Sequence, residues 1–194
     1  MVRFLPDVPQ VVATIAGARV VECAEVRRQV DEFETFVAQA WPRLLRSAWL
    51  LTGDWHRAED LVQTVLARAY GRWSRLANSN PEAYLRAMLA TTYLSWWRRR
   101  WRGEIPYERL PEHAAGDEHR GVELRHTLAE ALLRLPARQR AVLVLRFHGD
   151  LTEAATAQAL GLSVGTVKSY TSRALATLRA DERLRDLLSE EARS

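Results

Sequence analysis

The sequence predicts an all-α protein of two small helical domains joined by a flexible linker, with a helix-turn-helix in the second domain. Apolar residues recur at helical spacing along most of the chain, and no segment alternates like a strand. All seven tryptophans lie before residue 102, which indicates two separately built units. Between the units runs RGEIPYERLPEHAAGDEHRG, a polar stretch with prolines and glycines and no sustained period, as is typical of a linker.

The composition is that of a folded chain without a membrane anchor. Charged residues make up 27% and hydrophobic residues 47% of the 194 residues. The formal net charge of +4 favours a polyanionic partner only if the positive charges are clustered. Cys23 is the single cysteine, which excludes an internal disulfide and the common cysteine metal sites and is consistent with a cytoplasmic location. No apolar run approaches the ~20 residues needed to span a bilayer, so we expect neither a signal peptide nor a membrane partner.

The first domain is predicted over residues 31–102. Residues 1–30 are expected to be an N-terminal extension without a fixed fold, either regulatory or the product of an over-long translation start. Pro42 interrupts the first helical stripe and either kinks that helix or opens a second one. This stripe comprises Phe33, Phe36, Val37, Ala40, Leu44, Leu45 and Ala48.

Two further helices complete the first domain. Asp54 is a good N-cap for a helix over residues 54–73. Asn80 and Pro81 then mark the start of a helix that runs towards Trp101, because a capping residue is followed by proline at the first helical position. The apolar stripe of the 54–73 helix is Ala58, Leu61, Val62, Val65, Leu66, Ala69, Tyr70 and Trp73.

The linker is predicted over residues 103–123 and the second domain over residues 124–180, followed by a C-terminal tail over 181–194. A first stripe ends at Pro136, and Gly149 can serve as the C-cap for the helix after it. A short helix over 152–160, a turn at 161–163 and a longer helix over 164–178 finish the domain.

The turn is the most specific feature of the sequence. A helix-turn-helix needs a small residue where its helices cross, a glycine at the bend and an apolar residue that locks the second helix, and Ala157, Gly161 and Val167 meet these needs. Ser163 can cap the second helix. The alternative is an ordinary helical hairpin with a solvated polar face. The first turns of the second helix carry donors suited to base edges and phosphates, namely Thr166, Lys168, Ser169, Tyr170, Ser172 and Arg173.

A second group, YLSWWRRRWRG at residues 93–103, interleaves aromatic and arginine side chains and contains no acid. Arginines neutralise phosphates and aromatic faces stack on unpaired bases, so the group suits single-stranded or opening DNA. The alternative is that the tryptophans belong to the core and the arginines are a solvated cap on a helix C-terminus. The residues concerned are Tyr93, Trp96, Trp97, Arg98, Arg99, Arg100, Trp101 and Arg102.

A third group, Glu59, Asp60 and Gln63, shares the polar side of the 54–73 helix, where a partner site and a merely solvated face are both open. The chain shows no glycine-rich phosphate loop and no nucleophile or carboxylate pair suited to catalysis, so we expect no enzyme activity and no cofactor. The five histidines are too loosely spaced to predict a metal site.

At this point the sequence resembles a known family. LTGDWHRAEDLVQTVLARAYGRW, TYLSWWRRRWRGE and LRLPARQRAVLVLRFHGDLTEAATAQALGLSVGTVKSYTSRAL are similar to regions two and four of sigma-70-family factors, in their extracytoplasmic-function group and its SigE-like branch. The resemblance covers residues 31–180. It implies a transcription initiation factor that binds core RNA polymerase and promoter DNA, with an anti-sigma factor as a further partner.

The resemblance also implies roles for individual residues. Residues 31–102 would bind polymerase and the minus-ten element, and residues 124–180 would bind the minus-thirty-five element. Glu59, Asp60 and Gln63 would meet the clamp helices of the largest polymerase subunit. The loop with Asn78, Ser79 and Asn80 would hold a flipped promoter base, while Thr166, Lys168, Ser169 and Arg173 would contact duplex DNA. Two rivals are a self-standing helix-turn-helix regulator, which would normally dimerise on a two-fold site, and a protein whose main partner is another protein.

Overall fold

The computed structural model describes residues 8–77, 79–101 and 119–191, and these residues form helices and turns with no strand among them. The description therefore covers an N-terminal unit (residues 8–101) and a C-terminal unit (residues 119–191). The all-α prediction is confirmed. Residues 103–118 of the predicted linker lie outside the described residues, and its last residues, 119–123, are helical.

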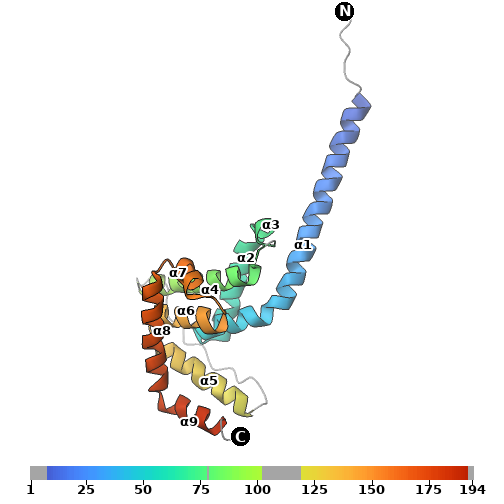
Figure 1. Ribbon diagram of the computed structural model, residues 1–194. Coiled ribbons are helices and arrows are strands. Elements are labelled where there is room, and N and C mark those ends of the chain that lie inside the picture. Colours follow the sequence, from blue (N-terminus) through green and yellow to red (C-terminus); the bar gives the residue numbers. More distant parts are fainter. Residues whose placement is uncertain (1–7, 78, 102–118, 192–194) are drawn as a thin grey trace, which may run out of the picture.

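The first helix, α1, runs without interruption from Val8 to Thr52, and its first half extends away from the rest of the molecule (Figure 1). Residues 8–30, for which the sequence predicts no fixed fold, are part of this helix, so no structural break marks the predicted boundary at residue 30. Between Pro9 and Pro42 the sequence contains no proline that could interrupt the helix. Pro42 lies inside α1 and does not open a second helix.

Three more helices complete the N-terminal unit: α2 (Trp55–Tyr70), α3 (Trp73–Leu76) and α4 (Pro81–Trp101). Asp54 caps α2 as predicted, because its side chain accepts a hydrogen bond of 2.8 Å from the Arg57 amide. The helix predicted over 54–73 is too long, since α2 ends before Gly71 and Trp73 begins the separate α3. Helices α2 and α4 pack against the second half of α1.

The C-terminal unit consists of α5 (His119–Arg134), α6 (Ala137–Leu143), a π-helical turn η1 (Val144–His148), α7 (Glu153–Leu160), α8 (Val164–Arg179) and α9 (Glu182–Glu191). Helix α5 begins earlier than the predicted domain boundary at residue 124. Gly149 ends η1 as predicted, and its amide donates to the Val144 carbonyl at 2.8 Å. The π-helical turn itself has no sequence signal that we can identify.

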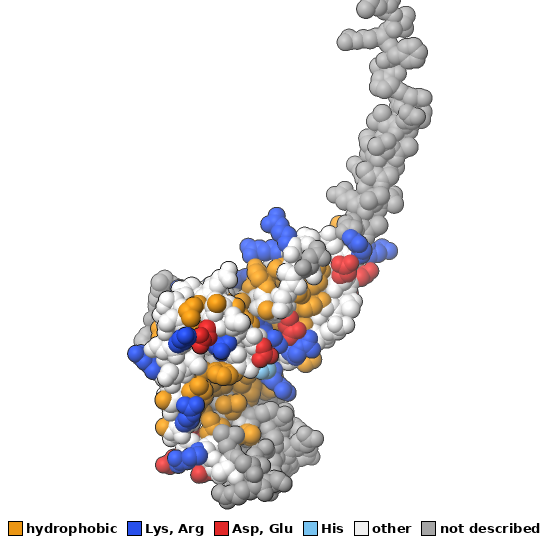
Figure 2. Space-filling model, viewed as in Figure 1, with side chains coloured by type: hydrophobic (Ala, Val, Ile, Leu, Met, Phe, Trp, Pro, Cys, Tyr) orange, Lys and Arg blue, Asp and Glu red, His pale blue; other side chains and the backbone are white. Residues whose placement is uncertain are grey.

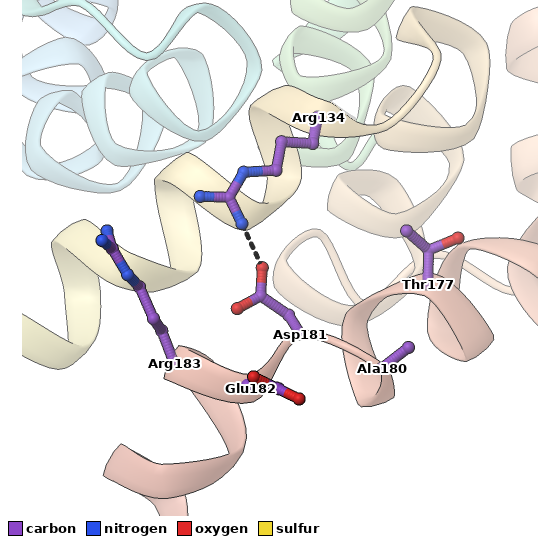
Figure 3. Close-up of a pocket in the computed structure, with 6 residues that line it drawn as sticks. All are labelled: Arg134, Thr177, Ala180, Asp181, Glu182 and Arg183. Carbon is purple, nitrogen blue, oxygen red and sulfur yellow. Dashed lines mark hydrogen bonds and ion pairs between the residues drawn. The ribbon is translucent and has the colours of Figure 1, made fainter.

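The predicted C-terminal tail also needs correction, because most of it forms α9, which packs against α5. Asp181 explains the docking, because it forms an ion pair with Arg134 of α5 (Figure 3). Its other carboxylate oxygen accepts a 3.3 Å hydrogen bond from the Leu184 amide in the first turn of α9. The hollow beside this ion pair is lined by residues of α5, α8 and α9 (Figure 3). The Asp181 carboxylate in its wall is already engaged by Arg134 and by the Leu184 amide.

The two units are not separate cores in this structure. Buried residues of α1, α2 and α4 form one continuous apolar cluster with Ala129 of α5 and with residues of α6, η1 and the turn before α7. Helix α4 packs against α6, η1 and α7, and α6 and α7 lie beside it in Figure 1. The C-terminal residues in this shared cluster are Ala129, Ala137, Ala141, Val144, Leu145 and Leu151.

Candidate nucleic-acid interface

The turn between α7 and α8 has the geometry of a helix-turn-helix. Gly161 adopts the left-handed conformation (φ 62°), which a residue with a side chain enters at a cost. Ser163 caps α8 by accepting a 3.1 Å hydrogen bond from the Thr166 amide. Val167 is fully buried and packs with Val142 and Ala157, so it fixes which face of α8 points inward.

The opposite face of α8 is the first candidate surface. Lys168, Ser172 and Arg173 are exposed. The Lys168 ammonium lies 3.8 Å from the Glu153 carboxylate in a solvent-exposed ion pair, in which a DNA phosphate could take the place of Glu153. Thr166 is half-buried, and its hydroxyl lies 2.8 Å from that of Ser163. Ser169 and Tyr170 are also half-buried. The Tyr170 ring packs on the cluster around Val167, so only part of it remains available to a partner.

The second candidate surface, at the C-terminal end of α4, divides between core and solvent. Tyr93 is 6% exposed and belongs to the apolar cluster. Trp96 and Trp97 are half-buried against the same cluster, and the Trp97 ring lies 6.4 Å from that of Tyr93. Arg98 and Arg99 are exposed. The side chains of Arg100 and Trp101, and all of Arg102, lie outside the described part of the chain.

In this conformation Tyr93 is out of reach of DNA, which departs from its assignment to the DNA surface. The physical reason is that the C-terminal unit covers it: the Arg140 guanidinium lies 5.7 Å from the centre of its ring. For the two tryptophans the structure combines both alternatives raised by the sequence, since each is partly core and partly surface.

The loop before α4 caps the N-terminus of this helix. Asn80 caps α4, because its side-chain oxygen accepts a 3.1 Å hydrogen bond from the Ala83 amide. The Ser79 hydroxyl donates to the Leu76 carbonyl at 2.9 Å. Both residues remain exposed, so a base could still contact them, while Asn78 lies outside the described residues.

The third candidate surface is the polar face of α2. Glu59, Asp60 and Gln63 are all exposed, while Leu61 and Val62 on the opposite side are fully buried. The helix is thus held by its apolar face. Its polar face is exposed to solvent, which agrees with a partner site and with a merely solvated face alike.

Arginines that the sequence patterns did not single out hold the two units together. Arg140 is 3% exposed and donates to the Leu51 carbonyl of α1 at 2.7 Å. Arg86 of α4 forms an ion pair with Glu82 at 2.7 Å and donates to the Gly149 carbonyl at 3.5 Å. One signal pointed to Arg140: it lies among inward positions of α6, next to Ala137 and Ala141, where a charge requires partners.

Hydrogen bonding, burial and neighbouring charges shift the pKa of Glu82 and of His148. A hydrogen bond from Arg43 is the main reason why the pKa of the Glu82 carboxyl is lowered. Burial is the largest cause of the lowered pKa of His148, and Arg86 and Arg46 add to it, whereas a backbone hydrogen bond at Arg43 and the Asp150 carboxylate oppose it. His148 therefore favours its neutral form in the folded protein.

Two of the candidate surfaces meet in one place. A cleft of about 520 Å³ between the units is lined by residues of both the α4 end and α8. We call it the inter-unit cleft, and its lining includes Thr91, Leu94, Trp97, Arg98, Arg138, Leu160, Tyr170 and Arg173. On the face shown in Figure 2, Lys and Arg side chains lie in separate groups interspersed with acidic ones, so that face carries no continuous basic patch among the described residues.

Features typical of metal sites and membrane spans are absent from the part of the chain that the structure describes. Within these ranges, no group of His, Cys, Asp and Glu side chains is arranged to hold a metal ion. None of the described helices combines the length and apolar character that crossing a membrane requires.

Two models of one protein family match the two units of this chain. The family model of Sigma-70 region 2 matches residues 28–103, and that of Sigma-70, region 4 matches residues 125–178. The RNA polymerase sigma-E factor of Streptomyces coelicolor is 44% identical over 160 residues, which cover 82% of this chain and 90% of that protein. The ECF RNA polymerase sigma factor SigL of Mycobacterium tuberculosis is 33% identical over 173 residues, or 86% of this chain and 94% of that protein.

A solved structure is similar as well. The sigma factor RpoE from Bartonella quintana, in complex with the anti-sigma factor NepR, is 27% identical with a TM-score of 0.60, over 81% of this chain and 96% of that one. The chain of CnrH in complex with the cytosolic domain of CnrY, at 22% identity and a TM-score of 0.50, covers 81% of this chain and 88% of that one and supports the fold alone.

Proposed function

Because this chain belongs to the extracytoplasmic-function group of the sigma-70 family, whose members direct core RNA polymerase to promoters, we propose that it does so through three surfaces. The single observation that carries the proposal is the capped helix-turn-helix. Fully buried Val167 fixes the inner face of α8, and Lys168 and Arg173 are exposed on the outer one.

The first surface recognises the upstream promoter element. The outer face of α8 enters the major groove at the minus-thirty-five position. Lys168 and Arg173 contact phosphates or base edges, with Thr166, Ser169, Tyr170 and Ser172 beside them. Each good contact with a base edge contributes about 1–3 kcal/mol to discrimination. The ion pair between Lys168 and Glu153 is exposed to solvent, so breaking it costs little free energy.

The second surface captures DNA as it opens at the minus-ten element. Trp96 and Trp97 keep part of each ring at the surface, and the exposed Arg98 and Arg99 follow them directly along α4. A base stacked on an aromatic ring gains about 1–3 kcal/mol, and the arginines bind the adjoining phosphates. Ser79 and Asn80 lie at the other end of α4, where the loop would hold a flipped base.

The third surface binds polymerase. The exposed Glu59, Asp60 and Gln63 on α2 contact the clamp helices, and this contact leaves the apolar face of α2 in the core. The polymerase carries out nucleotide addition, so this chain needs no catalytic residues and no cofactor of its own for this function. It acts where the polymerase acts, in the cytoplasm.

An anti-sigma factor is proposed as a further partner. The support is the fold similarity to an RpoE that was crystallised with its anti-sigma factor NepR. This partner would regulate the availability of the chain and would not replace the promoter function.

Run-off transcription tests the proposal. The purified full-length chain and core polymerase should together yield discrete transcripts from a genomic fragment library, and core polymerase alone should not. Absence of any chain-dependent transcript would overturn the sigma assignment. Co-purification with core polymerase separates the rivals, because a self-standing regulator would bind DNA as a dimer without polymerase.

A further inference from the structure

Lys168 differs in chemistry from every other basic side chain of the protein. It is the only lysine in the sequence, and the other 27 of the 28 lysine and arginine residues are arginines. An arginine guanidinium stays protonated and does not act as a nucleophile, whereas a lysine amine is a common acceptor of acyl groups. Among these side chains, only Lys168 can therefore be converted by acylation at nitrogen into a stable, neutral amide.

The amine of Lys168 is accessible from solvent. Its side chain is 65% exposed and lies on the outer face of α8, because the fully buried Val167 fixes the inner face. The Lys168 ammonium lies 3.8 Å from the carboxylate of Glu153 on α7, whose side chain is 36% exposed. A solvent-exposed ion pair of this kind contributes little free energy, so it does not keep a small acyl donor from the amine.

The position of Lys168 gives its modification a specific consequence. The proposed upstream surface on α8 carries Lys168 and Arg173, whereas the exposed cations described at the end of α4 are Arg98 and Arg99. Because arginine is not acylated, an acyl donor changes the charge of the α8 surface and leaves the charge of the α4 end as it is. One reaction can thus affect upstream recognition without affecting the capture of opening DNA.

Acylation removes a positive charge where the DNA backbone carries negative ones. A neutral amide cannot neutralise a phosphate, so the counterion release that favours binding is lost for that contact. The Glu153 carboxylate also loses its cationic partner, which leaves a negative charge beside the approaching phosphates. Both effects weaken the complex. We expect about tenfold lower affinity for duplex DNA, and a slope of log affinity against log salt that is smaller by about one.

We propose that Lys168 is a regulatory acylation site, at which transfer of an acetyl group from an acyl thioester or an acyl phosphate weakens recognition of the upstream element by α8. This inference rests on the proposed function of α8 and adds a means of controlling it.

The chemical step balances without an oxidant or a reductant. The deprotonated Lys168 nitrogen attacks the acyl carbon, and a C–N bond forms. The C–S bond of the thioester, or the C–O bond of the acyl phosphate, breaks, and the thiolate or phosphate leaves with the electron pair. Overall the ammonium loses two protons, of which the leaving group takes one and solvent takes the other.

The first test locates the modification in the full chain. A Cys23→Ser chain, in which no thiol competes for the acyl group, is incubated with acetyl phosphate in one sample and with acetyl-coenzyme A in another. Peptide mass mapping should find Lys168 as the acetylated side chain, and the two samples show which class of donor reacts. Lys168→Arg in the same background should leave only the N-terminal amine to react. An unmodified Lys168 in both samples would overturn the inference.

The second test measures promoter binding. The acetylated chain is freed of donor, assembled with core polymerase and titrated with a duplex that carries the upstream element, at several salt concentrations. Relative to the untreated chain, affinity should fall about tenfold and the salt slope should fall by about one. Lys168→Gln, which is neutral without treatment, should show a similar loss. Its far-UV circular dichroism should match that of the wild type, because the position is exposed.

Controls separate the loss of charge from other effects of the reagent. Lys168→Arg keeps a positive charge and cannot be acetylated, so the same treatment should not change its affinity. A bubble template with a minus-ten element and no upstream element should bind the acetylated and untreated holoenzymes alike. Equal affinity of the acetylated and untreated wild-type chains for the upstream duplex would overturn the inference. If the untreated holoenzyme binds no promoter DNA, the proposed function itself fails and the regulatory role falls with it, although the mass map does not change.

Discussion

At the scale of single residues, side chains that look alike in sequence serve different tasks. Lys168 and Arg173 point outward from α8, whereas Arg140 is enclosed by carbonyls and an aromatic ring. The difference lies in which face of its helix each occupies. Burial of a charge is tolerated only where hydrogen bonds replace its water shell, and Arg140 has three such bonds.

The cap at Asp54 gives a direct stability prediction. Its carboxylate accepts the Arg57 amide at 2.8 Å, so Asp54→Ala should lower the free energy of unfolding by about 1 kcal/mol. Urea denaturation of both proteins measures this difference. Asp54→Asn is the matched control, since asparagine caps equally well, and equal losses in the two variants would show that the cap is not the cause.

His148 predicts a pH dependence. Its pKa is lowered, mainly by burial, so the unfolded chain takes up a proton at a higher pH than the folded one. Its contribution to stability is therefore complete above the unfolded pKa of about 6.5 and is lost as the pH falls through the folded pKa. The free energy of unfolding of the wild type should fall between about pH 7.5 and 5.5.

The matched variant for this prediction is His148→Gln, which cannot titrate. Its free energy of unfolding should vary less with pH over the same range than that of the wild type. Denaturation curves at both ends of the range give the comparison. Equal slopes in the two proteins would assign the pH dependence to other groups.

At the scale of elements, each candidate surface is a helix face whose opposite side is fixed in the core. For α2, Asp60→Ala with Gln63→Ala should leave the melting temperature nearly unchanged, because exposed helix positions contribute within about 0.5 kcal/mol. Binding to core polymerase should weaken by about tenfold or more in a fluorescence titration. Glu130→Ala, an exposed acid on α5, is the control. Unchanged binding combined with lower stability would support a purely structural acidic face.

The two DNA surfaces should need different kinds of DNA. Lys168→Ala with Arg173→Ala should weaken binding of holoenzyme to duplex upstream DNA by about 1–3 kcal/mol for each base-edge interaction that is removed, and Arg179→Ala at the far end of α8 should not. Trp97→Leu keeps apolar volume against the core but removes a stacking face, so open-complex formation should suffer more than initial binding.

A pre-opened bubble template distinguishes these variants. It supplies unpaired bases without the cost of melting, so it should restore transcription to Trp97→Leu but not to the Lys168→Ala/Arg173→Ala chain on a promoter that needs its upstream element. Permanganate reactivity of the minus-ten thymines is the direct measurement. Wild-type reactivity in folded Trp97→Leu would remove this residue from the melting step.

At the scale of the whole molecule, the described units share one apolar cluster. The composition of residues 103–123 predicts a flexible tether, and because α5 takes up residues 119–123, protease should cut first within residues 103–118. Because the units pack together, we expect the two resistant fragments to co-elute on gel filtration after cleavage of the wild-type chain. Arg86→Met should make them separate more readily. Fragments of the wild type that part at once would contradict a stable interface, and a chain that resists cleavage would contradict the tether.

The sequence alone determined the helical class, the caps at Asp54 and Ser163, the bend at Gly161 and the outward faces of α2 and α8. Each depends on local chemistry: apolar spacing decides which face is buried, and short polar side chains or glycine satisfy helix ends. Helix lengths were less predictable. Residues 10–30 and 182–191 contain no proline, and they are helical in α1 and α9 although the sequence pattern predicts an extension and a tail there.

Only the tertiary structure decided which groups from distant parts of the chain meet. Arg140 and Leu51 are 89 positions apart, and nothing in the sequence near either predicts that one donates to the other. Likewise, the half-burial of Trp97, the covering of Tyr93 and the cleft shared by α4 and α8 depend on how the units dock. Periodicity reports the environment of a residue on its own helix, whereas docking depends on the summed fit of surfaces that the chain brings together only when it folds.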